Sequence, residues 1–206
     1  MRRFLLLILL VVSCSSPAAT LLVLGDSLSA GYGLAAGQGW VHLLEARISA
    51  RKLPYTVVNA SISGDTSAGG LARLGASLDQ TRPAWLLLEL GANDGLRGLP
   101  LAALRRNLEA IITMAQARGA RVVLIGMRLP PNYGEQYTEN FHGIYRDLAT
   151  RHHLPLVPFL LEGVALNPQL MQPDSLHPTA AAQPQLLDTV WQTLGPLLRQ
   201  NLEGAR

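Results

Sequence analysis

The segment from Asp174 to Pro178 holds a candidate for acid–base chemistry. Asp174 stands three residues before His177, and Pro178 follows directly. Proline is favoured in the first turn of a helix, which leaves His177 on the loop just before it. A carboxylate at this spacing can fold back and hold the Nδ1–H of the imidazole, so that the other ring nitrogen is free to act as a base. Taken alone, the pair also fits an exposed loop.

Ser27 is a candidate nucleophile, because it directly follows the first apolar run of the domain, within Gly25-Asp26-Ser27-Leu28. A serine is a poor nucleophile at its ordinary pKa and needs an adjacent base such as a histidine. The surrounding residues do not form the G-x-S-x-G elbow of the α/β-hydrolases. By itself, a serine at such a turn is more often a helix cap.

Two further turns offer hydrogen-bond donors for a developing negative charge. Gly64 follows the second apolar run and could bring a backbone N–H close to a ligand. Asn93 follows the third, and an amide donor at a sheet edge suits an oxyanion. Each residue also fits an ordinary turn, where glycine and asparagine are common.

Strands alternate with helices along the whole chain. Apolar runs predict five strands, at residues 21–24, 55–58, 85–90, 121–125 and 154–157. Helical spacing predicts helices at 40–51, around 71–78, 101–118, 141–151 and 180–202, the last interrupted at Pro184 and Pro196. This alternation predicts a single α/β domain, a three-layer sandwich with a five-stranded parallel sheet between helices. Such sheets bind ligands at the carboxyl ends of their strands, where all four polar motifs lie.

The motifs together resemble the SGNH (GDSL-type) hydrolases, in the order and at the strand ends that this family shows. The resemblance is carried by Gly25-Asp26-Ser27-Leu28, Gly64, Gly91-Ala92-Asn93-Asp94 and Asp174-x-x-His177. It extends from about Leu21 to the last helix. The stretches LGDSLSAGYG (24–33) and NASISGDTSAGGLA (59–72), with the loop at 129–134, are most similar to the bacterial exported arylesterase, thioesterase I and lysophospholipase group.

The resemblance implies a flavodoxin-like SGNH fold and a role for each matching residue. Ser27 would be the nucleophile, His177 its general base and later acid, and Asp174 the residue that orients His177. The oxyanion hole would comprise the backbone N–H groups of Ser27 and Gly64 and the side-chain amide of Asn93. Neither a metal-ligand cluster nor a glycine-rich phosphate loop stands in the sequence, so we expect no metal and no other cofactor.

The implied substrates are short and medium acyl esters, aryl esters, acyl thioesters and membrane-derived lysophospholipids. Six residues of the strand-end loops could line an acyl site or belong to the core: Leu28, Tyr32, Ile62, Leu96, Leu99 and Leu129. One alternative is a polysaccharide O-acetylesterase of the same family, which would share the catalytic residues. Another is a non-catalytic envelope lipoprotein, which should lack a nucleophile, base or donor; none is missing.

Composition excludes several classes of protein. With 49% hydrophobic and 15% charged residues, the 206-residue chain is neither intrinsically disordered nor, given the lengths of its apolar runs, a multipass membrane protein. A single cysteine, Cys14, excludes a disulfide scaffold. The formal charge of +3 falls to +1 without residues 1–19, which contain Arg2 and Arg3 and no acid, so we expect no nucleic-acid partner. No coiled-coil heptad is present, and we expect a monomer.

The first nineteen residues have the order of a secretory signal peptide. Arg2 and Arg3 precede nine apolar residues, and small residues follow as far as Ala19. We therefore expect cleavage near Ala18 or Ala19, a mature domain of residues 20–206, and a soluble periplasmic location. The alternatives are secretion or, because 11–14 resembles a lipobox, a lipoprotein anchored through Cys14.

Overall fold

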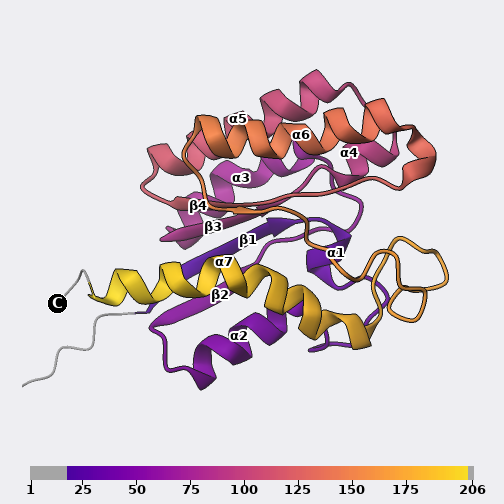
Figure 1. Cartoon of the computed structure of the whole chain (residues 1–206). Coiled ribbons are helices and arrows are strands. Elements are labelled where there is room, and N and C mark those ends of the chain that lie inside the picture. Colours follow the sequence, from indigo (N-terminus) through magenta and orange to yellow (C-terminus); the bar gives the residue numbers. More distant parts are fainter. Residues whose placement is uncertain (1–17, 204–206) are drawn as a thin grey trace, which may run out of the picture.

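Five parallel strands form the centre of the fold in the computed structural model, which describes residues 18–203 (Figure 1). The strands are β1 (Ala19–Gly25), β2 (Tyr55–Asn59), β3 (Trp85–Glu89), β4 (Arg121–Ile125) and β5 (Leu156–Val157). Their order in the sheet is β2-β1-β3-β4-β5. This is the doubly wound order in which the connections from β1 and β3 leave to opposite faces, so that a crevice opens between these two strand ends.

Helices cover both faces of the sheet (Figure 1). On one face lie α3 (Ser67–Thr81), α4 (Ala92–Leu96), α5 (Leu101–Ala117) and α6 (Glu135–Arg151). On the other lie α2 (Trp40–Ala50) and the C-terminal α7 (Gln183–Glu203), preceded by the short η2 (Ala180–Ala182). The one-turn α1 (Ser27–Ala30) follows β1 directly, and η1 (Pro131–Tyr133) precedes α6. The three-layer α/β prediction is confirmed.

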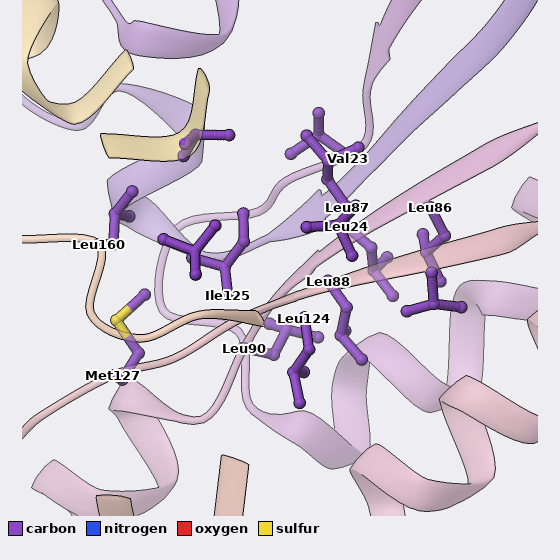
Figure 2. Packing of buried hydrophobic residues seen from close by; sticks show 14 of the residues in the cluster. Val23, Leu24, Leu86, Leu87, Leu88, Leu90, Leu124, Ile125, Met127 and Leu160 are labelled. Atoms are coloured by element: carbon purple, nitrogen blue, oxygen red, sulfur yellow. The ribbon is translucent and has the colours of Figure 1, made fainter. Parts of the chain in front are cut away.

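The core is built from leucine-rich strands that are buried on both faces. Every residue of β3 is buried, and the apolar residues of β1 from Leu21 to Leu24 have no exposed surface. Figure 2 shows side chains of β1 and β3 packed with those of β4 and with residues beyond the strand ends; the labelled residues include Val23, Leu24, Leu86, Leu87, Leu88, Leu124, Ile125, Met127 and Leu160. Continuous apolar runs of this kind are typical of central parallel strands, which have no solvent face. The sheet is therefore a rigid platform for the loops at its carboxyl edge.

Several predicted boundaries differ from the structure. The helix predicted at 141–151 begins six residues earlier, at Glu135, because its first turns are polar and lack an apolar repeat. The fifth strand has two residues rather than four. Pro184 lies in the first turn of α7, where its missing N–H leaves no carbonyl unpaired. Pro196 does not interrupt α7, contrary to the prediction.

The predicted signal peptide lies almost entirely outside the described residues, so its boundary stays a prediction. Ala18 and Ala19 are described, and Ala19 is the first residue of β1, where it pairs with Tyr55. Between residues 18 and 203, no helix is both long enough and apolar enough to cross a membrane.

Candidate active site

The residue Ser27 begins α1 immediately after β1 ends. Asp26 caps this short helix, since its Oδ1 accepts a hydrogen bond from the N–H of Leu28 at 3.0 Å. Such a cap uses one of the free N–H groups at a helix start and fixes the turn. Ser27 is therefore held at the carboxyl edge of the sheet with its hydroxyl facing the loop that precedes α7.

His177 and Asp174 lie next to Ser27 and form a hydrogen-bonded chain with it. Nε2 of His177 lies 2.8 Å from Oγ of Ser27, and Nδ1 lies 2.7 Å from Oδ2 of Asp174. Oδ1 of Asp174 accepts from the N–H groups of Leu176 and His177. Partial burial works to raise the pKa of Asp174, but these bonds and the imidazole outweigh it and lower the pKa to about 2. Because ionised Asp174 can only accept, it holds the Nδ1 proton and leaves Nε2 to accept from the Ser27 hydroxyl.

The loop that carries His177 is fastened to the loop that follows α1. Gln172 donates from its backbone N–H to the carbonyl of His177 at 2.7 Å, and from its side-chain amide to the carbonyl of Tyr32 at 2.9 Å. The ring of Tyr32 packs against the imidazole, with centroids 4.5 Å apart. These contacts hold the base in place against the nucleophile.

Asn93 joins the turn that carries Ser27 to the turn that carries Gly64. Its Nδ2 donates to Oδ2 of Asp26 at 3.2 Å and to the carbonyl of Asp65 at 3.0 Å. Asp26 and Asp65 are the chain neighbours of Ser27 and Gly64, so all three expected oxyanion donors come to one edge of the sheet. Gly64 has φ +80°, a left-handed conformation that favours glycine. Asn93 lies in the first turn of α4, not in the ordinary turn that was the alternative interpretation of this residue.

A guanidinium ion holds the loop that contains Gly64. Arg73, on α3, pairs with Oδ2 of Asp65 at 2.8 Å. It also donates to the carbonyl of Ala60, and to that of Gly25 at 3.4 Å. One side chain thus joins the turn after β1 to the loop after β2.

Two acidic side chains are fully buried behind Ser27. Asp26 has no exposed surface, and desolvation raises its pKa to about 6, although bonds from Leu28 and Asn93 oppose the rise. Glu89, the last residue of β3, is equally buried. Its pKa is raised well above the ordinary range, first by desolvation and then by the nearby charge of Asp26. The turn with the nucleophile therefore rests on a pair of buried carboxyl groups.

A mainly apolar pocket of about 330 Å³ opens beside the hydroxyl of Ser27. Asn93 and His177 belong to its wall. The apolar lining includes Leu28, Leu96, Met127, Leu129, Phe159, Leu161, Leu166 and Met171. Of the six lining residues that the sequence suggested, Leu28, Leu96 and Leu129 are confirmed, whereas Tyr32, Ile62 and Leu99 do not line the pocket.

Sequence reasoning missed three residues that support the site. Arg73 had no signal beyond its helical position, and Asp94 was noted only as part of its motif, although it accepts two hydrogen bonds from Ser67 at the start of α3. Glu89 did carry a signal, because it is the one acid within the apolar run 85–90. His142, on α6, is also buried, and its Nδ1 lies 3.1 Å from the carbonyl oxygen of Met127.

The arrangement can carry out acyl transfer. It provides a hydroxyl in contact with an imidazole, a carboxylate that fixes the imidazole tautomer, and donors at one edge where negative charge could develop. Within residues 18–203, no group of three or more His, Cys, Asp or Glu side chains could hold a metal ion.

A parallel α/β sheet of this order, with Ser27, Gly64, Asn93 and His177 gathered at its carboxyl edge, is the arrangement that the resemblance to the SGNH hydrolases predicted. The sequence profile of the GDSL-like Lipase/Acylhydrolase family matches residues 23–183. The chain belongs to this family and is a carboxylic ester hydrolase.

Known relatives match nearly the whole chain. Esterase TesA of Pseudomonas aeruginosa is 53% identical over 192 residues, which cover 93% of this chain and 96% of the relative. Thioesterase 1/protease 1/lysophospholipase L1 of Escherichia coli K12 is 46% identical over 198 residues, covering 96% and 93%. A crystal structure of TesA superposes with a TM-score of 0.85 at 54% identity, covering 86% of this chain and 99% of the other.

Proposed function

We propose that the protein hydrolyses carboxylic esters and thioesters through an acyl intermediate on Ser27. The observation that carries the proposal is the chain of hydrogen bonds from Ser27 through His177 to Asp174, at 2.8 and 2.7 Å, beside an apolar pocket. In this proposal, Ser27 Oγ attacks the acyl carbon while Nε2 of His177 takes its proton. The C–O or C–S bond then breaks, and the same proton passes to the departing alcohol or thiol.

Deacylation repeats the same steps with water in place of the serine hydroxyl. His177 removes a proton from water, the hydroxide attacks the acyl carbon, and Ser27 Oγ leaves with that proton. The tetrahedral intermediates carry a negative oxygen, for which we assign the N–H groups of Ser27 and Gly64 and the amide of Asn93 as donors. The Nδ2 group of Asn93 already donates to Asp26 and to the carbonyl of Asp65. In this proposal, one of its N–H groups would be shared between its present acceptor and the oxyanion, as a three-centre hydrogen bond.

For substrates, we propose short and medium acyl esters, aryl esters, acyl thioesters and lysophospholipids. The relative from Escherichia coli is named as a thioesterase and lysophospholipase. The pocket volume of about 330 Å³ and its apolar lining suit an acyl chain longer than acetyl. We expect the enzyme to act as a monomer on one small acyl substrate at a time.

Two experiments test the proposal. Ser27→Ala should abolish turnover and labelling by a fluorophosphonate probe; retained turnover would show that another group is the nucleophile. A rate panel on the purified domain should compare p-nitrophenyl esters of increasing chain length, an acyl-CoA and lysophosphatidylcholine. A sharp fall in rate beyond acetate would favour the polysaccharide O-acetylesterase alternative, and absence of labelling in the wild type would contradict the proposed acyl intermediate on Ser27.

We also propose that residues 1–19 direct export to the periplasm. Of the two expected cleavage sites, the one after Ala18 would leave β1 whole, because Ala19 is its first residue and donates from its N–H to the carbonyl of Pro54 at 2.9 Å. Cleavage after Ala19 would remove this residue. Mass spectrometry of the native N-terminus separates this outcome from lipidation of Cys14, which would leave an acylated cysteine as the first residue.

A further inference from the structure

None of the chemical steps proposed above involves Glu89, although this residue lies directly behind the turn that carries Ser27. The register of β1 and β3 pairs Gly25 with Glu89, so the acidic side chain lies against the turn that carries Ser27. A Cβ atom at Gly25 would lie 2.5 Å from Oε2 of Glu89, which is too close for any side chain. The glycine therefore allows the carboxyl group to approach the turn.

The Glu89 carboxyl group binds the chain on both sides of Ser27. Its Oε2 accepts from the hydroxyl of Ser29 at 2.7 Å and from the N–H of Asp26 at 3.2 Å. Its other oxygen, Oε1, is buried and has no hydrogen-bond partner among residues 18–203. Oε2 alone therefore binds Asp26, which precedes Ser27, and Ser29, which lies two residues after it. Oε1 is left without a hydrogen-bond partner among the described residues.

The surroundings of Glu89 favour an uncharged group. The titratable groups facing it are the carboxyl of Asp26 and, from α6, the hydroxyl of Tyr145, which donates to the carbonyl of Leu90. Arg73 contacts the carbonyl of Gly25 next to this turn, and its charge is paired with Asp65. If Glu89 were ionised, its charge would be fully buried, its Oε1 would have no hydrogen-bond donor, and the carboxylate of Asp26 would lie beside it. A buried charge in these surroundings is strongly unfavourable.

We propose that Glu89 is a positioning residue for the hydrolysis at Ser27, acting as a neutral carboxylic acid that fixes the turn on both sides of the nucleophile. Because a neutral Glu89 does not repel the carboxylate of Asp26, Asp26 can stay charged and accept the hydrogen bond from the side-chain amide of Asn93. Neutrality also avoids a further negative charge close to the point where the oxyanion forms. The inference rests on the roles proposed above for Ser27 and Asn93.

The test compares Glu89→Gln with Glu89→Leu. Glutamine keeps a neutral acceptor in place, whereas leucine fills a similar space without any acceptor. Active sites are counted with a fluorophosphonate probe, so that kcat refers to functional sites alone. We expect Glu89→Gln to retain kcat on a soluble p-nitrophenyl ester within about threefold, and Glu89→Leu to lose at least about tenfold with KM changed less than about twofold.

Two results would overturn the inference. An unchanged kcat per titrated site in Glu89→Leu would reduce Glu89 to a structural residue, since a fold defect lowers the number of sites rather than the turnover of each. A shift of more than about half a pH unit in the acid limb of kcat/KM for Glu89→Gln would mean that wild-type Glu89 is charged, because removing a charge moves the titration of its neighbours.

A second variant keeps the test decisive if Glu89→Leu does not fold. Ser29→Ala removes one donor to Glu89 and adds no volume, and we expect a smaller fall in kcat with KM retained; full activity in this variant would contradict the positioning role. Ser27→Ala is measured in parallel. Retained turnover in Ser27→Ala would reject the proposed function itself. Lost turnover in Ser27→Ala, together with an unchanged kcat in Glu89→Leu and Ser29→Ala, would reject only the inference.

Discussion

The ring of Tyr32 packs on the imidazole of His177, with centroids 4.5 Å apart and planes inclined by 40°. Tyr32 follows the helix that begins with Ser27, and His177 lies on the loop before α7, so this contact joins the segments that carry the nucleophile and the base. Tyr32 is 53% exposed, and among the described residues its hydroxyl forms no hydrogen bond with Ser27, His177 or Asp174. The ring surface, rather than the hydroxyl, is therefore what supports the base.

Tyr32→Ala should lower kcat on a soluble ester by about 3- to 10-fold, as expected from the loss of an aromatic contact of about 0.5–1.5 kcal/mol. Tyr32→Phe is the matched control and should keep kcat near the wild-type value, because the ring remains. Steady-state kinetics on p-nitrophenyl butyrate measure both. Equal losses in the two variants would point to the hydroxyl and contradict the packing role.

Asn93→Ala should lower kcat by about 10²–10³, the range found when one oxyanion donor is removed, with a smaller change in KM. Thermal unfolding of the variant serves as the control, since the mutation also removes the bonds to Asp26 and Asp65. A folded variant with near-normal kcat would reject the oxyanion assignment.

Arg73→Ala should separate the turn after β1 from the loop after β2. We expect the free energy of unfolding to fall by about 2 kcal/mol, because a charged donor loses a carboxylate and carbonyl partners. We also expect kcat to fall about 10- to 100-fold as Gly64 moves relative to Ser27. Arg73→Lys keeps the charge but lacks the planar fork, and intermediate values are expected. Urea unfolding and steady-state kinetics test both variants. A loss of stability with unchanged kcat would show that Arg73 stabilises the fold but does not position Gly64 for catalysis.

The raised pKa of Glu89 predicts how stability depends on pH. Above the ordinary value of 4.5, the unfolded chain releases this proton while the folded protein keeps it, so the free energy of unfolding falls as pH rises. One proton gives a slope of at most about 1.4 kcal/mol per pH unit. Asp26, with its pKa raised to about 6, acts in the same direction between 3.8 and about 6.

Glu89→Gln removes the contribution of Glu89 and leaves that of Asp26. The free energy of unfolding of Glu89→Gln minus that of the wild type should therefore increase from pH 5 to pH 8. Urea unfolding of both proteins at each pH unit measures this difference. A difference that does not change with pH would contradict a protonated Glu89 in the folded state.

A bulky residue at Ala165 should shorten the acyl chain that the enzyme accepts. Ala165 belongs to the pocket wall, and Ala165→Phe would place a ring in the space of about 330 Å³. We expect the rate on p-nitrophenyl octanoate to fall at least about tenfold while that on the acetate changes little, since only the longer chain needs the lost space. An equal effect on both esters would mean that the acyl chain lies elsewhere.

Much of the fold was predictable from local patterns. Apolar runs and helical spacing located all five strands and the main helices, because a parallel sheet with helices on both faces buries whole strands and one side of each helix. The patterns were weaker where an element is short or polar. The one-turn helices at Ser27–Ala30 and Ala92–Leu96 and the polar start of α6 had no apolar repeat to reveal them.

The sequence by itself determined which residues stand at strand ends and which residue types are available there: a serine, a glycine, an asparagine and an Asp–His pair. It also determined the Asp174–His177 spacing, because a three-residue separation is a local property of one loop. The resemblance to the SGNH hydrolases implied that His177 acts on Ser27, but only the tertiary structure shows the contact between these two residues, which are 150 positions apart. The tertiary structure also decided that Asn93 joins two turns and that Glu89 lies behind Gly25. These relationships depend on strand order and register, which arise from burial of the whole sheet and leave no mark on the spacing of the residues involved.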